Sequence, residues 1–318
     1  MTTDPSSWQK RITGTWWGRP AIYDASGNWV GYHTVHRSSV FENGRTTYYM
    51  DTETFASGPL YARYEAPTFA FGVQDGDKDR IYLGPDFIGA GHPFGMLVDA
   101  HYYSPGWTSD LRTMVHILPD GETQVYSSLL YDGPTISGVF NGVYKNALDY
   151  ETNPQTRAHI DAFVAKEQTD GQRLHLLPVK HAGTWQGEME VYDANQQKVG
   201  VNQVTIHYRP LTLLRAEWQV QIAGVINRTW TTQRGRNGIR HTFEGPDVFG
   251  NGIAYGRPLY TSQHFYREAL KLKTRDFFFD DEYSLSAVWD WLASDKRQYM
   301  TFGVLRWTAG EEVLTAHY

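Results

Sequence analysis

The sequence has no cysteine, no long apolar run and no strong excess of one charge. Without cysteine, the chain cannot form disulfides, thiolate metal sites or a cysteine nucleophile, which excludes a disulfide-dense secreted scaffold. Lys and Arg number 29 and Asp and Glu number 35, a net charge of −6 over 318 residues with no basic tail, so we expect no nucleic-acid partner. No apolar run approaches the roughly 18 residues that cross a bilayer, and the N-terminal residues lack the pattern of a signal peptide. We therefore expect a cytoplasmic protein without a membrane span.

Aromatic residues and glycine are abundant instead. Phe, Trp and Tyr make up 15% of the chain, and there are 30 glycines. This combination favours short strands joined by tight turns. A charged fraction of 20% and a hydrophobic fraction of 41% exclude a disordered chain.

Two sequence blocks occur twice in the same order. Residues 14–18 (GTWWG) return 169 positions later at 183–187 (GTWQG), and residues 84–91 (GPDFIGAG) return 161 positions later at 245–252 (GPDVFGNG). Two matched blocks at nearly the same offset indicate an internal duplication. The second copy is eight residues shorter between the two blocks.

Each copy is predicted to be built of strands. Strand-like segments recur roughly every 8–12 residues, which is typical of a sandwich or barrel rather than a parallel sheet. Turn residues separate two pairs of them, Pro119 to Glu122 in the first copy and Asp280 to Glu282 in the second, as in β-hairpins. The clearest predicted strands are 29–41, 111–118, 123–130, 274–279 and 284–291.

Two segments are predicted to be helical. Residues 4–10 begin with Asp4 as a helix cap and Pro5 in the first turn, and a second helix begins at Asn153-Pro154 and runs to about Glu167. Because the second helix precedes the second Gly-Thr-Trp block, we interpret it as a connector. We therefore expect two domains, residues 1–175 and 176–318.

The Gly-x-Trp motif that opens each copy, at Trp16 and again at Trp185, resembles the first-strand signature of lipocalins and the wider calycin group. The resemblance implies an all-β protein of two tandem lipocalin-like antiparallel barrels, with a short N-terminal helix and a connecting helix. Its layout is similar to that of carotenoid hydratases and lipocalin-like natural-product cyclases. In this group the Trp closes the barrel floor beneath an Arg from the last strand, a position that Arg306 occupies here.

A small barrel of this kind encloses a cavity for one ligand. Walls of Trp, Tyr and Phe would suit a flat apolar or aromatic small molecule, and we expect Trp107, Trp218 and Trp230 to contact it. The alternative is that the aromatic rings simply fill two cores.

A polar cluster of the first copy is the best candidate for catalysis. On a strand, Asp99, His101 and Tyr103 point to one face, where the carboxylate could orient the imidazole for acid–base work. The following strand adds His116 as a further catalytic candidate and Arg112 as a substrate ligand. The alternative is a polar strand that faces solvent.

Further candidates for substrate binding differ between the two copies. His92 is matched by an apolar residue in the second copy, Arg257 could anchor an anionic group, and His264 and Tyr266 share a strand face. Residues 234–238 (RGRNG) are predicted to be a solvated hairpin turn.

The duplicated acidic residues Asp86 and Asp247 are predicted to stabilise turns. His33 and His36 fall on opposite strand faces, so we expect no metal site. The chain has no phosphate loop, dinucleotide fingerprint or nucleophile elbow.

These observations leave three functions open. The first is a cofactor-independent enzyme that isomerises, cyclises, hydrates or dehydrates an apolar molecule. The second is a carrier for such a molecule, and the third is a haem-binding barrel with His92 or His101 as the axial ligand. The chain is expected to be a monomer or homodimer.

Overall fold

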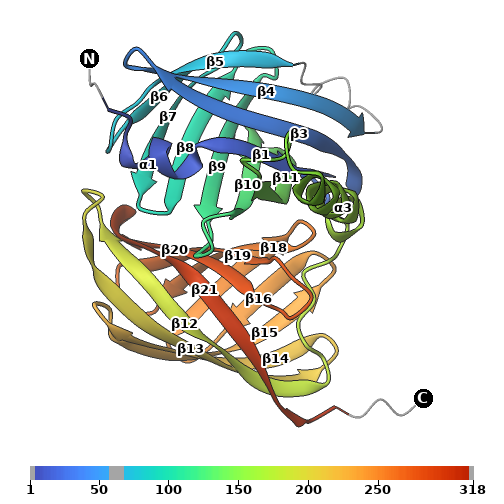
Figure 1. The fold of residues 1–318 in the computed structure, drawn as a ribbon. Helices are drawn as coiled ribbons and strands as arrows, with labels where there is room; N and C mark the ends of the chain where they lie inside the picture. The colour runs from blue at the N-terminus through green and yellow to red at the C-terminus, as the bar shows by residue number, and fades with distance from the viewer. Residues whose placement is uncertain (1–3, 57–67, 315–318) are drawn as a thin grey trace. The chain divides into compact units, whose positions relative to one another are not determined.

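The structure is a computed structural model that describes residues 4–56 and 68–314 (Figure 1). The chain forms two compact units, and the division falls between Arg173 and Leu174. Each unit is built around its own antiparallel barrel. The all-β fold of two tandem barrels is thus confirmed.

In the first unit a short helix precedes eleven strands and a longer helix follows them. Its elements are α1 (Ser7–Ile12), β1 (Gly14–Gly18), β2 (Ala21–Asp24), β3 (Trp29–Glu42), β4 (Arg45–Ala56), β5 (Phe69–Gln74), β6 (Arg80–Leu83), β7 (Ile88–Phe94), β8 (Leu97–Ser104), β9 (Ser109–Ile117), β10 (Thr123–Asp132), β11 (Thr135–Asn146) and α3 (Pro154–Asp170).

The second unit consists of ten strands in a closed barrel. They are β12 (His181–Asp193), β13 (Lys198–Thr212), β14 (Arg215–Gly224), β15 (Arg228–Asn237), β16 (Arg240–Glu244), β17 (Val248–Ala254), β18 (Pro258–Phe265), β19 (Leu270–Phe278), β20 (Leu285–Ala293) and β21 (Lys296–Glu312).

The first barrel closes through β1 and β2, which together take the place that β12 takes alone in the second. Both short strands pair with β3 on one side and β11 on the other. The interruption falls at Arg19-Pro20, where proline provides no N–H for the sheet. Strand β11 passes so close that a Cβ on Gly142 would lie 2.7 Å from the Pro20 Cα.

The same turns recur in the two units at the offsets seen in the sequence. The carboxylate of Asp24 accepts hydrogen bonds from the backbone N–H groups of Ser26 and Asn28, and that of Asp193 accepts them from Asn195 and Gln197. Each Gly-Pro-Asp block also forms a turn closed by the N–H of its glycine. The structure therefore repeats itself where the sequence does.

Helix α1 begins two residues later than the sequence indicates. Ser6, rather than Asp4, is its N-cap and accepts a hydrogen bond from the Gln9 N–H at 3.1 Å. The Ser6 side chain also donates to Asp75 at 2.6 Å, which fixes the start of the helix. Helix α3 begins as predicted, with Asn153 as N-cap. Neither helix is both long and apolar enough to cross a membrane, among the residues that the structure describes.

The two Gly-x-Trp tryptophans are fully buried, and their indole N–H groups bind different elements. The Trp16 indole N–H donates to the Ile12 carbonyl of α1, whereas that of Trp185 donates to the Tyr283 carbonyl of a loop. Trp307 packs against Trp185, with ring centroids 4.3 Å apart. The expectation that Arg306 covers Trp185 is wrong, because its guanidinium instead donates to Ser284 and lies over the Phe279 ring.

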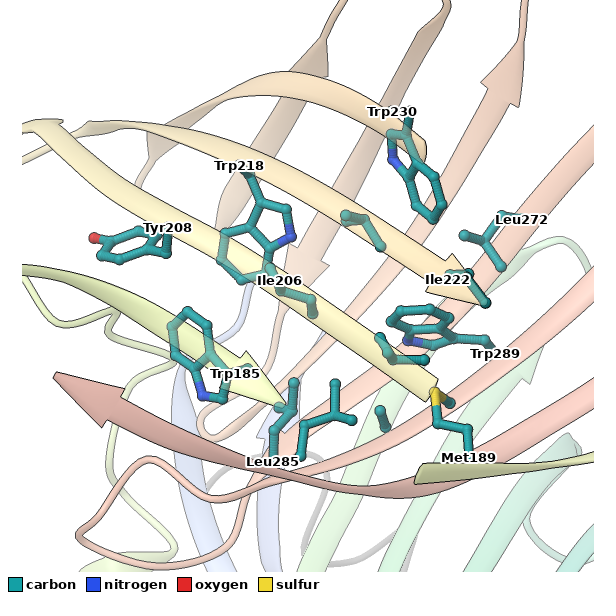
Figure 2. Packing of buried hydrophobic residues seen from close by; sticks show 14 of the residues in the cluster. Trp185, Met189, Ile206, Tyr208, Trp218, Ile222, Trp230, Leu272, Leu285 and Trp289 are labelled. Carbon is teal, nitrogen blue, oxygen red and sulfur yellow. The ribbon is translucent and has the colours of Figure 1, made fainter. Parts of the chain in front are cut away.

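Large side chains fill the interior of the second barrel. Figure 2 shows Trp185, Trp218, Trp230 and Trp289 among the aliphatic side chains of the neighbouring strands. All four indoles are at least nine-tenths buried, and Trp185 and Trp218 stack with ring centroids 5.2 Å apart. This interior is a packed hydrophobic core.

Candidate functional site

The first barrel contains a cavity of about 780 Å³. Residues from most of its strands and from α1 line it. The aromatic members of the lining are Trp8, Tyr48, Phe69, Phe71, Tyr82, Phe87, Tyr102, Trp107, Tyr126, Phe140 and Tyr144. The volume lies within the usual range for small-molecule sites, roughly 300–1,000 Å³.

Strand alternation determines which side chains face this cavity. On β8, Val98, Tyr102 and Ser104 line it. Two glycines of the neighbouring strand β7 make room for two of the rings. A Cβ on Gly91 would lie 2.5 Å from the Tyr82 hydroxyl, and a Cβ on Gly89 would lie 2.5 Å from the Tyr102 ring. The glycine-rich block of β7 thus allows two tyrosines to pack inside the barrel.

A positively charged side chain also lies in the cavity wall. Arg37 of β3 lines it and donates to the Gln124 side-chain oxygen at 2.6 Å. Its guanidinium carbon lies 5.7 Å from the centre of the Tyr144 ring. The Gln124 side-chain nitrogen, Nε2, is buried and has no hydrogen-bond partner within residues 4–56 and 68–314.

Five tyrosines lie within the electrostatic reach of Arg37. Burial raises the pKa of each phenol, to about 12 for Tyr48, while the Arg37 charge acts in the opposite direction. All five are therefore neutral at pH 7 and keep their O–H donors. The other four are Tyr82, Tyr102, Tyr126 and Tyr144.

His33 is a second polar group in the cavity wall. Burial lowers its pKa to about 4, so the imidazole is neutral at pH 7. Its Nδ1 lies 3.5 Å from the Thr54 hydroxyl, and its Nε2 is buried with no hydrogen-bond partner among the residues that the structure describes. The ring packs against Phe140 with centroids 4.9 Å apart.

One carboxylate also borders the cavity. Asp86 accepts hydrogen bonds from the backbone N–H of Gly106 and from the Ser104 hydroxyl. These bonds tie the β8–β9 turn to the segment before β7, as expected for a turn-stabilising residue.

The predicted catalytic cluster lies on the outside of the barrel. Asp99, His101 and Tyr103 share one face of β8, opposite the residues that line the cavity. His101 is about half exposed and its Nε2 lies 3.3 Å from an Asp110 oxygen. The hypothesis that this cluster acts inside the cavity is therefore wrong, because the strand begins in the opposite phase, and the cluster belongs to a polar outer face.

The neighbouring candidates on β9 also face away from the cavity. Thr113 and Val115 line it, so Arg112 and His116 point outward. Arg112 is exposed and lies over the Tyr131 ring, with 5.4 Å between its guanidinium carbon and the ring centre. His116 is buried, which lowers its pKa to about 4.

His92 lies outside the barrel as well, on β7, where its Nδ1 lies 3.0 Å from an Asp79 oxygen. Both proposed haem ligands, His92 and His101, are thus remote from the cavity lining. Trp107 is the predicted residue that the structure does bring to the cavity, where its ring meets Phe140 edge-on at 5.9 Å.

The candidates in the second barrel do not form one site. Trp218 and Trp230 belong to the packed core. Arg257 is buried over the Phe277 ring, while His264 and Tyr266 flank the exposed Phe249 ring on the outer surface. His264 lies on β18, whereas Tyr266 follows the end of that strand, so the two do not share a strand face.

One segment of the second barrel that is predicted to be a solvated turn begins with a buried strand residue. Arg234 is 3% exposed, points inward from β15 and donates to the His241 imidazole at 3.3 Å. The prediction of a solvated turn beginning at this residue is wrong, since β15 continues to Asn237 and β16 begins at Arg240.

Burial also raises the pKa of Asp276 to about 6, and its carboxylate accepts hydrogen bonds from Trp289 and Thr274.

Arg37 was not predicted as a site residue, although the sequence contains a usable signal. At the offset of 169 residues its counterpart is Ile206, and the two barrels confirm this match because Arg37 pairs with Trp16 as Ile206 pairs with Trp185. A charged residue in one copy therefore replaces a core residue of the other.

Within residues 4–56 and 68–314, no group of three or more His, Asp or Glu side chains is placed to hold a metal ion.

No protein-family model matches the chain, and no curated protein matches it. Among solved structures, it is similar to a Nostoc punctiforme protein of unknown function from the DUF3598 family. The TM-score is 0.59 at 10% sequence identity, over 96% of this chain and 100% of the other. At this identity the likeness shows a shared fold alone. A Bacteroides fragilis protein aligns over 95% of this chain and 100% of its own at 7% identity, but its TM-score of 0.17 carries no argument.

Proposed function

We propose that the first barrel is lipocalin-like in function and binds an apolar, largely aromatic small molecule in its interior. The observation that carries this proposal is the cavity of about 780 Å³ with its aromatic lining. Cores are normally packed without voids larger than a water molecule. A cavity of this size, surrounded by a well-formed barrel, favours a ligand over a packing defect.

Binding without chemical change is the function that the geometry supports best. The predicted catalytic residues are not among those that line the cavity. An enzyme that isomerises, cyclises or hydrates its ligand is the second candidate, favoured by one observation. His33 presents a neutral imidazole with an unpartnered Nε2 in the cavity wall, as a general base requires.

Filling the cavity tests the binding proposal. Thr52 lines the cavity from β4, and the next residue, Glu53, is exposed on the outer face. The neutral fluorophore N-phenyl-naphthylamine should brighten on binding wild type, and Thr52→Trp should weaken its affinity about tenfold or more by occupying the site.

The control is Glu53→Trp, which places the same side chain on the outer face of the same strand. It should leave the affinity of the dye within about twofold of wild type. Equal affinities for all three proteins, or no binding by folded wild type, would contradict the proposal.

The fate of a bound molecule separates the two candidate functions. Anything that copurifies with the protein can be extracted and identified by mass spectrometry, then returned to the protein for a long incubation. Recovery of the unchanged molecule supports a carrier. Conversion that is lost in His33→Gln supports the enzyme.

A further inference from the structure

Arg37 brings a positive charge to the wall of the aromatic cavity. Its hydrogen-bond partner Gln124 is neutral. Not one of the described residues places a carboxylate within ion-pair distance of its guanidinium. Arg37 is half-buried in the cavity wall, and a charge that is partly withdrawn from water is stabilised by a partner of opposite charge.

A second arginine of the same barrel, Arg80, has the partners expected of a buried charge that stabilises the fold. Arg80 is fully buried and forms an ion pair with Asp75. Its Nη1 donates to the Ser6 hydroxyl at 3.1 Å, and its Nη2 donates to the Tyr48 hydroxyl at 3.2 Å. Arg80 is not part of the cavity lining, whereas Arg37 is. The barrel thus neutralises one arginine internally and leaves the other facing the cavity.

The groups around Arg37 are donors. Burial keeps the phenol of Tyr144, whose ring lies against the Arg37 guanidinium, protonated, and the Gln124 Nε2 has hydrogens but no partner among the described residues. A guanidinium beside neutral O–H and N–H donors is the arrangement that binds an oxyanion through charge-assisted hydrogen bonds.

The second barrel provides an internal control for this position. The residue that matches Arg37 there is Ile206, which is 1% exposed and belongs to the hydrophobic core. The fold therefore does not require a cation at this point of the barrel. A role in binding explains why the hollow barrel has one.

We infer that the ligand of the first barrel carries a single oxyanion, a carboxylate or sulfonate, on an apolar or aromatic body, and that Arg37 binds this anionic group. The inference rests on the proposed function and adds the chemical class of the ligand. The apolar body would lie along the aromatic walls, and the anion beside Arg37 and Gln124.

Two dyes with one skeleton test the inference. Anilinonaphthalene sulfonate differs from neutral N-phenyl-naphthylamine by its sulfonate. Arg37→Met should weaken binding of the anionic dye about tenfold or more and change the affinity of the neutral dye by less than about threefold. Arg37→Lys keeps the charge and should retain most of the anionic affinity.

Arg45→Met is the matched control, since it removes one positive charge from an exposed position of the same barrel. It should leave both affinities unchanged. If Arg37→Met does not fold by circular dichroism, Arg37→Gln, which retains a donor for the Gln124 oxygen, gives the same comparison.

The outcomes separate this inference from the proposal beneath it. If the neutral dye binds and Arg37→Met weakens both dyes equally or neither, the inference is overturned while the proposed function stands. If wild type binds neither dye, both are overturned.

Discussion

The two barrels share a strand order and differ in what their interiors hold. In the second barrel, tryptophans and aliphatic side chains pack into one continuous core. In the first, the aromatic side chains line a cavity instead of filling it. A duplicated frame has therefore produced one packed barrel and one hollow barrel.

The difference is visible at matched positions of one strand. On β3 the residues His33, Val35 and Arg37 face the cavity, and 169 positions later β13 has Asn202, Val204 and Ile206. The valine is common to both, while the arginine occurs in the hollow barrel alone. At the third of these positions the hollow barrel therefore has a cation where the packed barrel has an aliphatic core residue.

The largest expected contrast concerns the loss of an interior indole. Trp230 is 4% exposed and meets Phe265, Trp289 and Trp291, so Trp230→Ala should cost about 3–5 kcal/mol of unfolding free energy. Trp107→Ala should cost less than about half of that, because this ring already borders a cavity. Urea denaturation of the full chain measures both, and similar costs would contradict the contrast.

Acidification provides the next contrast. Burial lowers the pKa of His116 from 6.5 to about 4 in the folded first barrel. Unfolded chains therefore take up protons that the folded protein does not, and stability is lost as the pH falls from 6.5 towards 4. His33 and, in the second barrel, His241 act in the same direction, whereas Asp276, with its raised pKa, acts in the opposite one.

The matched variant is His116→Gln, which removes one titrating group. Between pH 7 and pH 4.5 its unfolding free energy should fall by about 2–3 kcal/mol less than that of wild type. Equal losses in the two proteins, measured by denaturation at each pH, would show that His116 titrates normally.

The smallest effect concerns the helix at one end of the hollow barrel. Ser6 caps α1, whose Trp8 and Ile12 line the cavity. Ser6→Ala should cost about 1–2 kcal/mol and weaken ligand binding as well. Ser7→Ala, one residue further along, is the comparison, because Ser7 is not the cap and its hydroxyl forms only an exposed hydrogen bond, to Asp77 at 2.9 Å, so it should cost less. An equal loss in both variants would mean that the cap does not hold the helix in place.

The sequence predicted the architecture well, because both the sequence blocks and the structural elements that they form occur twice. The Gly-Thr-Trp and Gly-Pro-Asp blocks mark equivalent strands and turns in both copies. Asn153-Pro154 correctly placed the start of α3. The start of α1 was missed because the Ser6 hydroxyl donates a hydrogen bond to Asp75, a residue too distant in sequence for a local pattern to reveal.

The candidate site was harder to predict, since it depends on the phase of each strand. Alternation correctly grouped Asp99, His101 and Tyr103 on one face, but it does not say which face is inside. The inward face of β8 is the one that carries Val98 and Tyr102, because this face is more apolar than the face that carries Asp99 and His101. Arg37 was missed because its role depends on the cavity, which no local pattern reveals.

The number of bound ligands tests the central claim most directly. Native mass spectrometry of the full chain with excess N-phenyl-naphthylamine should show one dye per chain in wild type and in Glu53→Trp, and none in Thr52→Trp. Two dyes per chain, or one dye that persists in Thr52→Trp, would contradict the division into one hollow and one packed barrel.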